Sequence, residues 1–140
     1  MPAKTPLLIV TFLYVIRLGV NFAHGHAHGD LSVPLTEWQQ AFVWTVIVVA
    51  PTVAVIFLWI RPSAAVAWAL TGALAAGWIF GLYFHFGPAN PDHVTAMPDA
   101  PGRSLFVQTA IALAVVEPLV AVAAGWLALT LGRSKDARHA

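Results

Sequence analysis

The sequence predicts an all-α integral membrane protein whose chain folds as a four-helix transmembrane bundle. Two observations lead to this fold class. Hydrophobic residues make up 59% of the 140 residues and charged residues only 9%, which is more apolar material than the core of a soluble domain of this length can bury. The charged residues also gather between four long apolar runs, and lipid is the natural solvent for such runs.

The four apolar runs are interpreted in chain order as helices of a single transmembrane domain over residues 1–140. A helix rises about 1.5 Å per residue, so the last three runs exceed the roughly 30 Å thickness of the hydrocarbon layer. The first and shortest run has an alternative interpretation as a secretory signal peptide, but Arg17 interrupts its apolar stretch. The expected helices cover about residues 6–22, 38–60, 63–86 and 104–131.

The basic residues predict which end of the bundle faces the cytoplasm. Lys4, Arg61 and a tail over residues 132–140 fall at one end, whereas Arg103 is alone among the basic residues at the other. Because cytoplasmic segments carry the excess of Lys and Arg, both termini are expected inside. Two outer loops, residues 23–37 and 87–103, are then expected on the periplasmic face of a bacterial inner membrane.

Histidines gather in these two expected loops. The segment "NFAHGHAHGD" carries three of them at alternate positions, and further His and Asp residues follow at the end of the third helix and in the second loop. Imidazole is a common ligand of Cu, Zn and Ni, and carboxylates can complete such a site, whereas the absence of cysteine excludes thiolate ligands. The candidate metal ligands are His24, His26, His28, Asp30, His85, Asp92 and His93.

The spacing of the first three histidines suits a metal in either backbone state. In an extended segment His24, His26 and His28 share one face. In a helix His24 and His28 share a face and His26 points away. The alternatives are adventitious metal binding or a pH-responsive surface. For His85 they are an aromatic-belt position at the membrane interface or a haem ligand.

Two charged residues lie inside the expected spans, where burial in lipid is costly and usually serves a function. Arg17 lies about one turn from the expected outer end of the first helix, and Glu117 lies near the middle of the fourth, just before Pro118. They could pair if tilt or water covers a depth difference of about 10 to 12 Å, but an Arg17 that reaches the outer headgroups is favoured. Glu117 is interpreted as a proton carrier, an ion ligand or an interhelical hydrogen-bonding group.

Small residues at helical spacing indicate close helix contacts. Gly77 and Gly81 form a GxxxG motif, and Ala121 with Gly125 repeats the spacing. Such motifs pack helices together within a chain, against a membrane-protein partner or in a homo-oligomer.

Three functions fit these observations. The first is a small membrane protein that binds a transition metal, copper ahead of zinc or nickel, for metal handling, delivery or import, without catalysis by the isolated chain. The second is an accessory subunit of a membrane redox complex, such as an oxidase or a copper-dependent monooxygenase. A haem-b anchor ranks last, because only His85 lies in an expected helix. Nucleic acid is excluded as a partner, because no clustered basic face is present.

Overall fold

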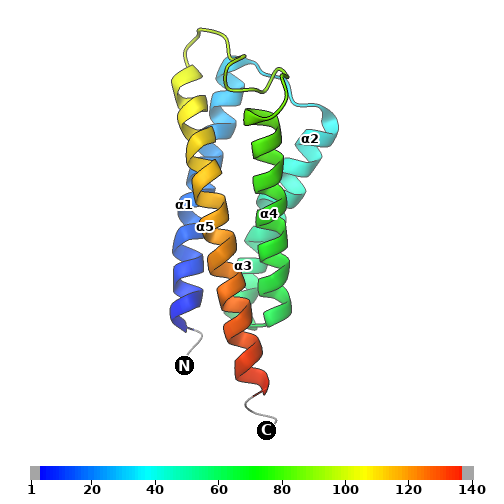
Figure 1. Ribbon diagram of the computed structural model, residues 1–140, viewed down its shortest axis with the longest axis vertical. Helices are drawn as coiled ribbons and strands as arrows, with labels where there is room; N and C mark the ends of the chain where they lie inside the picture. Colours follow the sequence, from blue (N-terminus) through cyan, green and yellow to red (C-terminus); the bar gives the residue numbers. More distant parts are fainter. Residues whose placement is uncertain (1–3, 137–140) are drawn as a thin grey trace.

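The computed structural model describes residues 4–136, which form an all-helical bundle. Four helices are long and apolar enough to cross a membrane, so the predicted fold class is confirmed at that level. They run side by side, and both ends of the described chain lie at the same end of the bundle (Figure 1). The elements are α1 (Lys4–Leu31), α2 (Glu37–Phe42), the π-helix η1 (Val43–Val49), α3 (Ala50–Ile60), α4 (Ala64–Phe86) and α5 (Arg103–Asp136).

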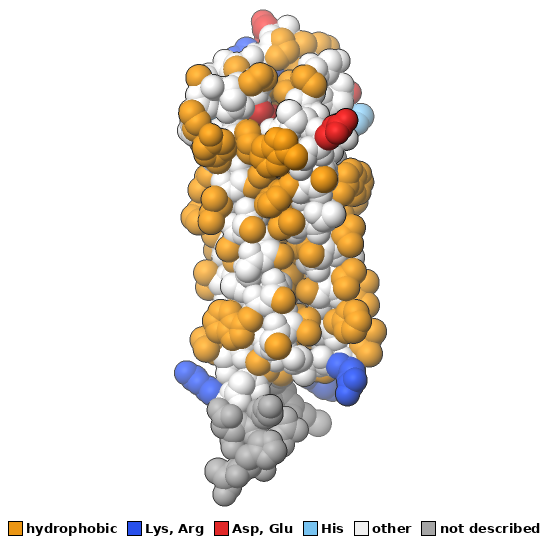
Figure 2. Space-filling view, turned by 90° about the vertical axis from the view of Figure 1, so that its right-hand side faces the viewer, with side chains coloured by type: hydrophobic (Ala, Val, Ile, Leu, Met, Phe, Trp, Pro, Cys, Tyr) orange, Lys and Arg blue, Asp and Glu red, His pale blue; other side chains and the backbone are white. Residues whose placement is uncertain are grey.

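The helix α5 is the centre of the packing, because α1 and α4 both lie along it. The elements α2, η1 and α3 follow one another as the second membrane crossing, which packs on α4. A buried apolar cluster that includes Val10, Leu70 and Leu127 fills the half of the bundle nearer the termini. Large apolar side chains cover the outside, and Figure 2 shows them along the length of the bundle, with the charged side chains near its ends. This distribution is the one that a lipid environment favours.

The expected end of the first helix at residue 22 is wrong, because α1 continues to Leu31 and contains the whole histidine segment. Gly25 and Gly29 each cost a helix about 1 kcal/mol, which argued for a loop. Burial of Ala27 and Leu31 in a second apolar cluster offsets that cost. The first expected outer loop therefore shrinks to residues 32–36, whereas most of the second is irregular as expected.

The expected tail over residues 132–140 is helical as far as Asp136, because α5 is longer than predicted. The remaining part of that tail, residues 137–140, lies outside the described residues.

Two prolines leave backbone carbonyls available inside the bundle. Pro51 has no N–H for the carbonyl of Ile47 four residues earlier, and the preceding turns form the π-helix η1. That carbonyl instead accepts a hydrogen bond from Nη1 of Arg17 at 2.6 Å. In α5, Pro118 in the same way provides no N–H for the carbonyl of Ala114. That carbonyl accepts a hydrogen bond from the indole Nε1 of Trp78 at 2.9 Å. Each proline thus supplies an acceptor for a side chain of a neighbouring helix.

Arg17 and Glu117 form a buried ion pair in the middle of the bundle. Nε and Nη2 of Arg17 donate to Oε1 of Glu117 at 3.1 and 2.6 Å, and the Arg17 side chain is fully buried. The expectation that Arg17 reaches the outer headgroups is therefore wrong. The depth difference disappears because α1 is longer than expected: Arg17 lies fourteen residues before the end of α1, and Glu117 lies fourteen residues after the start of α5.

We predict that Arg17→Met lowers the free energy of unfolding by about 3 to 5 kcal/mol, because it leaves the Glu117 carboxylate buried without its partner. The double variant Arg17→Met with Glu117→Met should recover much of the loss, since neither charge is then buried. Thermal unfolding in detergent, followed by circular dichroism, measures both. Arg103→Met is the matched control, because it breaks only an exposed ion pair with Asp99. A single Arg17 variant as stable as the unmodified protein would contradict the prediction.

Candidate metal centre

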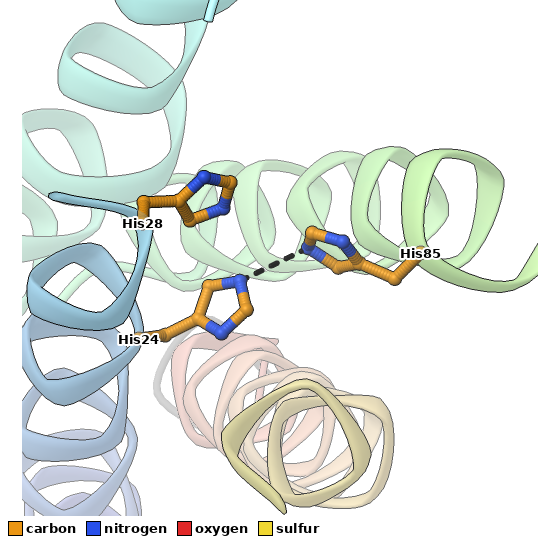
Figure 3. Close-up of side chains that lie close together, drawn as sticks. All are labelled: His24, His28 and His85. Carbon is orange, nitrogen blue, oxygen red and sulfur yellow. Dashed lines mark hydrogen bonds between the residues drawn. The ribbon is translucent and has the colours of Figure 1, made fainter. Parts of the chain in front are cut away.

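Three histidine side chains converge at the loop end of the bundle. His24 and His28 project from successive turns of α1, and His85 projects from the last turn of α4 (Figure 3). One ring nitrogen of each lies within 4.8 Å of the others. The helical alternative for the histidine segment is therefore correct, and the extended one is wrong.

The hydrogen bonds of His24 determine which of its ring nitrogens carries the proton. The Thr109 hydroxyl donates its single hydrogen to the carbonyl of Leu105 at 2.6 Å. Its oxygen therefore accepts from Nδ1 of His24, which lies 2.8 Å away. Nε2 of His24 is left with a free lone pair, the form in which imidazole binds a metal.

His85 is oriented in the same way by the chain that follows it. Its Nδ1 lies 3.1 Å from the backbone oxygen of Asp92, which can only accept, so Nδ1 carries the proton and Nε2 the lone pair. The Nε2 atoms of His24 and His85 face one another 3.1 Å apart (Figure 3). Two lone pairs at this distance repel unless a metal ion or an additional proton neutralises them. Metal–nitrogen bonds of 2.0–2.1 Å in tetrahedral geometry place two ligand nitrogens about 3.3 Å apart, close to the separation found here.

Asp92 places a buried carboxylate beside two of the three rings. Its Oδ1 lies 3.4 Å from Nε2 of His28, and its Oδ2 lies 3.6 Å from Nδ1 of His85. Neither Oδ1 of Asp92 nor Nδ1 of His28 has a hydrogen-bond partner within the described part of the chain. Burial raises the pKa of Asp92 to about 7. A cation among the histidines would supply the positive charge that this carboxylate lacks.

The other three predicted ligands lie away from this cluster. His26 is exposed on the opposite side of α1, 3.6 Å from Asp30. His93 is half-buried, and its Nδ1 accepts from the backbone N–H of Thr95 at 3.2 Å. His26 and Asp30 lie away from the cluster because of helical geometry: alternate residues of a helix do not share a face. We therefore assign His24, His28, His85 and Asp92 to the candidate site and leave out the other three.

Two residues of the site were missed by sequence reasoning. Thr109 orients His24, and the ring of Phe106 packs against His24, His28 and His85 with centroid distances of 4.7, 4.9 and 5.3 Å. Both lie in the first turns of α5. A hydroxyl in an apolar run is an ordinary feature of membrane helices, so Thr109 carried no signal without the position of His24.

A cavity of about 520 Å³ extends from the three histidines toward the ion pair. Gly77 lies inside it, where an added Cβ would meet side chains of Ile47 and Glu117 at 3.4 and 3.5 Å. Gly125 faces Trp68 and Thr71 of α4 at 3.8 and 3.9 Å. The small residues of the predicted packing motifs therefore serve helix contacts and internal space within the chain.

Comparisons of the chain with protein-family models, with curated proteins and with solved structures found no match. Function must therefore be inferred from the chemistry of the site. Its four donor residues come from α1, from α4 and from the irregular segment after α4, and α5 supplies the partner that orients His24.

We predict that Asp92→Asn stabilises the metal-free protein increasingly as the pH rises from about 4 to about 7. In the unmodified protein the unfolded chain ionises this carboxyl near 3.8 and the folded chain only near 7, so folding stability falls across this window. The variant has no charge to bury, and its advantage should reach on the order of 1 to 3 kcal/mol above pH 7. Chemical denaturation in EDTA at pH 5 and pH 8 measures it. Equal pH dependence of the two proteins would show that the charge of Asp92 is not buried.

Proposed function

We propose that this protein binds a transition-metal ion at the loop end of its membrane bundle, through His24, His28 and His85. One observation carries the proposal: two buried imidazoles turn their lone pairs toward each other at 3.1 Å while hydrogen bonds at Nδ1 hold both rings in place. Ring orientation by a hydrogen bond at the second nitrogen is the usual arrangement around metal-binding histidines. Asp92 serves as an oxygen ligand or as a charged neighbour of the ion.

The donor set supports copper as the first candidate, ahead of zinc and nickel. It offers three imidazoles and one carboxylate, and the chain contains no cysteine. For a site of nitrogen and oxygen donors, affinity among the divalent first-row ions is highest for Cu²⁺. A site with three histidines also suits Zn²⁺, which keeps its fourth position for water or substrate.

The surrounding structure favours holding or delivering the ion over conducting it across the membrane. Toward the termini the interior is a packed cluster of apolar side chains, which includes Leu7, Leu58 and Leu127. Within the described residues, the buried charged groups deeper than the histidines are Arg17 and Glu117, and they neutralise each other. An ion would find no polar route through that half of the bundle.

The geometry does not favour a haem between His24 and His85. The two rings touch edge to face, with centroids 4.8 Å apart. A porphyrin between two axial imidazoles would hold their coordinating nitrogens on opposite faces of its plane, two metal–nitrogen bonds or about 4 Å apart, whereas Nε2 of His24 and Nε2 of His85 lie 3.1 Å apart.

We predict that His24→Ala, His28→Ala and His85→Ala each weaken copper binding at least about tenfold, because each removes a ligand. Elemental analysis after equilibrium dialysis of the detergent-solubilised protein against Cu²⁺, Zn²⁺ and Ni²⁺ measures the effect and ranks the metals. His26→Ala and His93→Ala are matched controls, since they remove imidazoles of the same region that lie outside the cluster, and they should retain stoichiometric metal.

Thr109→Val provides a further test of the same ligand set, because it preserves shape and removes only the group that orients His24. It should lower metal affinity by roughly 10- to 100-fold. Metal content that follows His26 or His93 instead of His24, His28 and His85 would mean that residues outside the cluster bind the ion adventitiously, and the proposal would fail.

The histidine end is proposed to face the periplasm, with both termini in the cytoplasm, from the distribution of basic residues. A cysteine introduced by Asp99→Cys should then react with an impermeant maleimide in intact cells, and one introduced by Pro62→Cys should react only after lysis. Both positions are exposed, at opposite ends of the bundle. The reverse labelling pattern would put the histidine end in the cytoplasm.

A further inference from the structure

The cavity below the histidines lies at membrane depth. Most of its lining comes from the four candidate membrane spans, and the segment 32–35 covers it at the loop end. Glu117 lies eight residues beyond Thr109 on α5, so the histidine end and the ion-pair end are separated by about 12 Å along the helix. The volume of about 520 Å³ falls within the range of small-molecule sites in proteins.

The walls of the cavity are apolar, and aromatic rings are prominent among them. Trp44, Trp78, Phe80 and Leu113 contribute to the lining. Trp44 is also 58% exposed on the outside of the bundle, so the cavity reaches the lipid-facing surface beside it. A molecule dissolved in the bilayer can therefore enter without passing through water.

The ends of the cavity are polar, and no Lys or Arg of the described residues lines it that could neutralise an anionic ligand. At the inner end the Glu117 carboxylate is already paired with Arg17. The amide nitrogen of Asn21, a hydrogen-bond donor, is buried in the lining near Glu117, and within the described residues no acceptor meets it in hydrogen-bonding geometry. An oxygen acceptor would satisfy this donor, whereas a charged ligand would pay the full cost of entering the low-dielectric interior.

We propose that this cavity binds an uncharged, lipid-soluble molecule that carries a hydrogen-bond-accepting oxygen. The cavity holds this molecule between the three histidines and Glu117. The cavity itself needs no metal. Only the further consequence, that the bound molecule lies next to a metal ion, rests on the function proposed above.

Two glycines of α4 offer a matched pair of variants. An added Cβ at Gly81 would make ordinary contact with Cδ2 of His85 at 3.9 Å, and the residue lines the cavity, so Gly81→Leu fills the space. Gly72 has nothing within 4 Å of its added Cβ, so Gly72→Leu adds the same side chain to the same helix outside the cavity. Leu113→Phe narrows the cavity from α5 without adding a tryptophan and serves as a second blocking variant.

The probe is 10-bromo-1-decanol, added to the full-length protein in lipid nanodiscs. Its bromine quenches tryptophan fluorescence on contact, and Trp44 and Trp78 line the cavity. We expect saturable quenching in the unmodified protein and in Gly72→Leu. Gly81→Leu and Leu113→Phe should weaken it at least about tenfold, because they occupy the space. The carboxylate analogue 10-bromodecanoate should also bind at least about tenfold more weakly, because it is charged.

Quenching that rises linearly with probe and is equal in all variants would mean partition into the bilayer alone, and would overturn the proposal. Equal binding of the alcohol and the carboxylate would overturn its restriction to uncharged molecules. Copper content measured on the same samples separates the two proposals. Saturable probe binding without copper would support the cavity site and contradict the metal centre. Copper binding without saturable probe binding would support the metal centre and contradict the cavity site.

Discussion

The contact between the Arg17 guanidinium and the Glu117 carboxylate fixes the depth at which α1 and α5 meet. Neither group can leave for water, so the two helices keep the one register in which both charges are paired. The same register brings His24 beside Thr109 about two turns closer to the loops. A third bond, from Arg17 to the Ile47 carbonyl that Pro51 leaves available, ties the second crossing to this pair. The cavity and the histidine cluster both depend on this alignment.

The number and approximate positions of the helices followed from hydropathy, because four apolar runs separated by charged segments admit few other arrangements in a membrane. The end of α1 did not follow. By local propensity, a segment that contains Gly25, Gly29 and three histidines is expected to be a loop. The segment is helical because Ala27 and Leu31 are buried against the segment near Met97 and Phe106. Tertiary packing of that kind has no local signature. One misplaced boundary also displaced Arg17 in depth and concealed its pairing with Glu117.

The residue types of the candidate site could be predicted from the sequence. Which of the His and Asp residues belong to the site could be predicted only in part. His24 and His28 follow from helical spacing once the segment is known to be helical. His85 and Asp92 are seven residues apart, and only the return of the chain over the end of α4 brings the Asp92 oxygen to the His85 ring. Residue type alone could not separate these from His26, Asp30 and His93, because exposed and buried ligands have the same chemistry. What separates them is whether their side chains converge on one point, which is a property of the assembled bundle.

The histidine cluster draws its parts from nearly the whole length of the chain. His24 and His28 belong to the first helix, His85 to the end of α4, and the orienting hydroxyl of Thr109 to α5. During synthesis the first two histidines therefore emerge long before their partners, and a chain inserted only as far as its second crossing has two imidazoles on one helix and nothing to close around an ion. The proposed ion site would be complete, with Thr109 orienting His24, only after α5 has entered the bilayer. Occupancy would thus mark a chain in which α5 is in place, and the bound ion would join α1 to the end of α4.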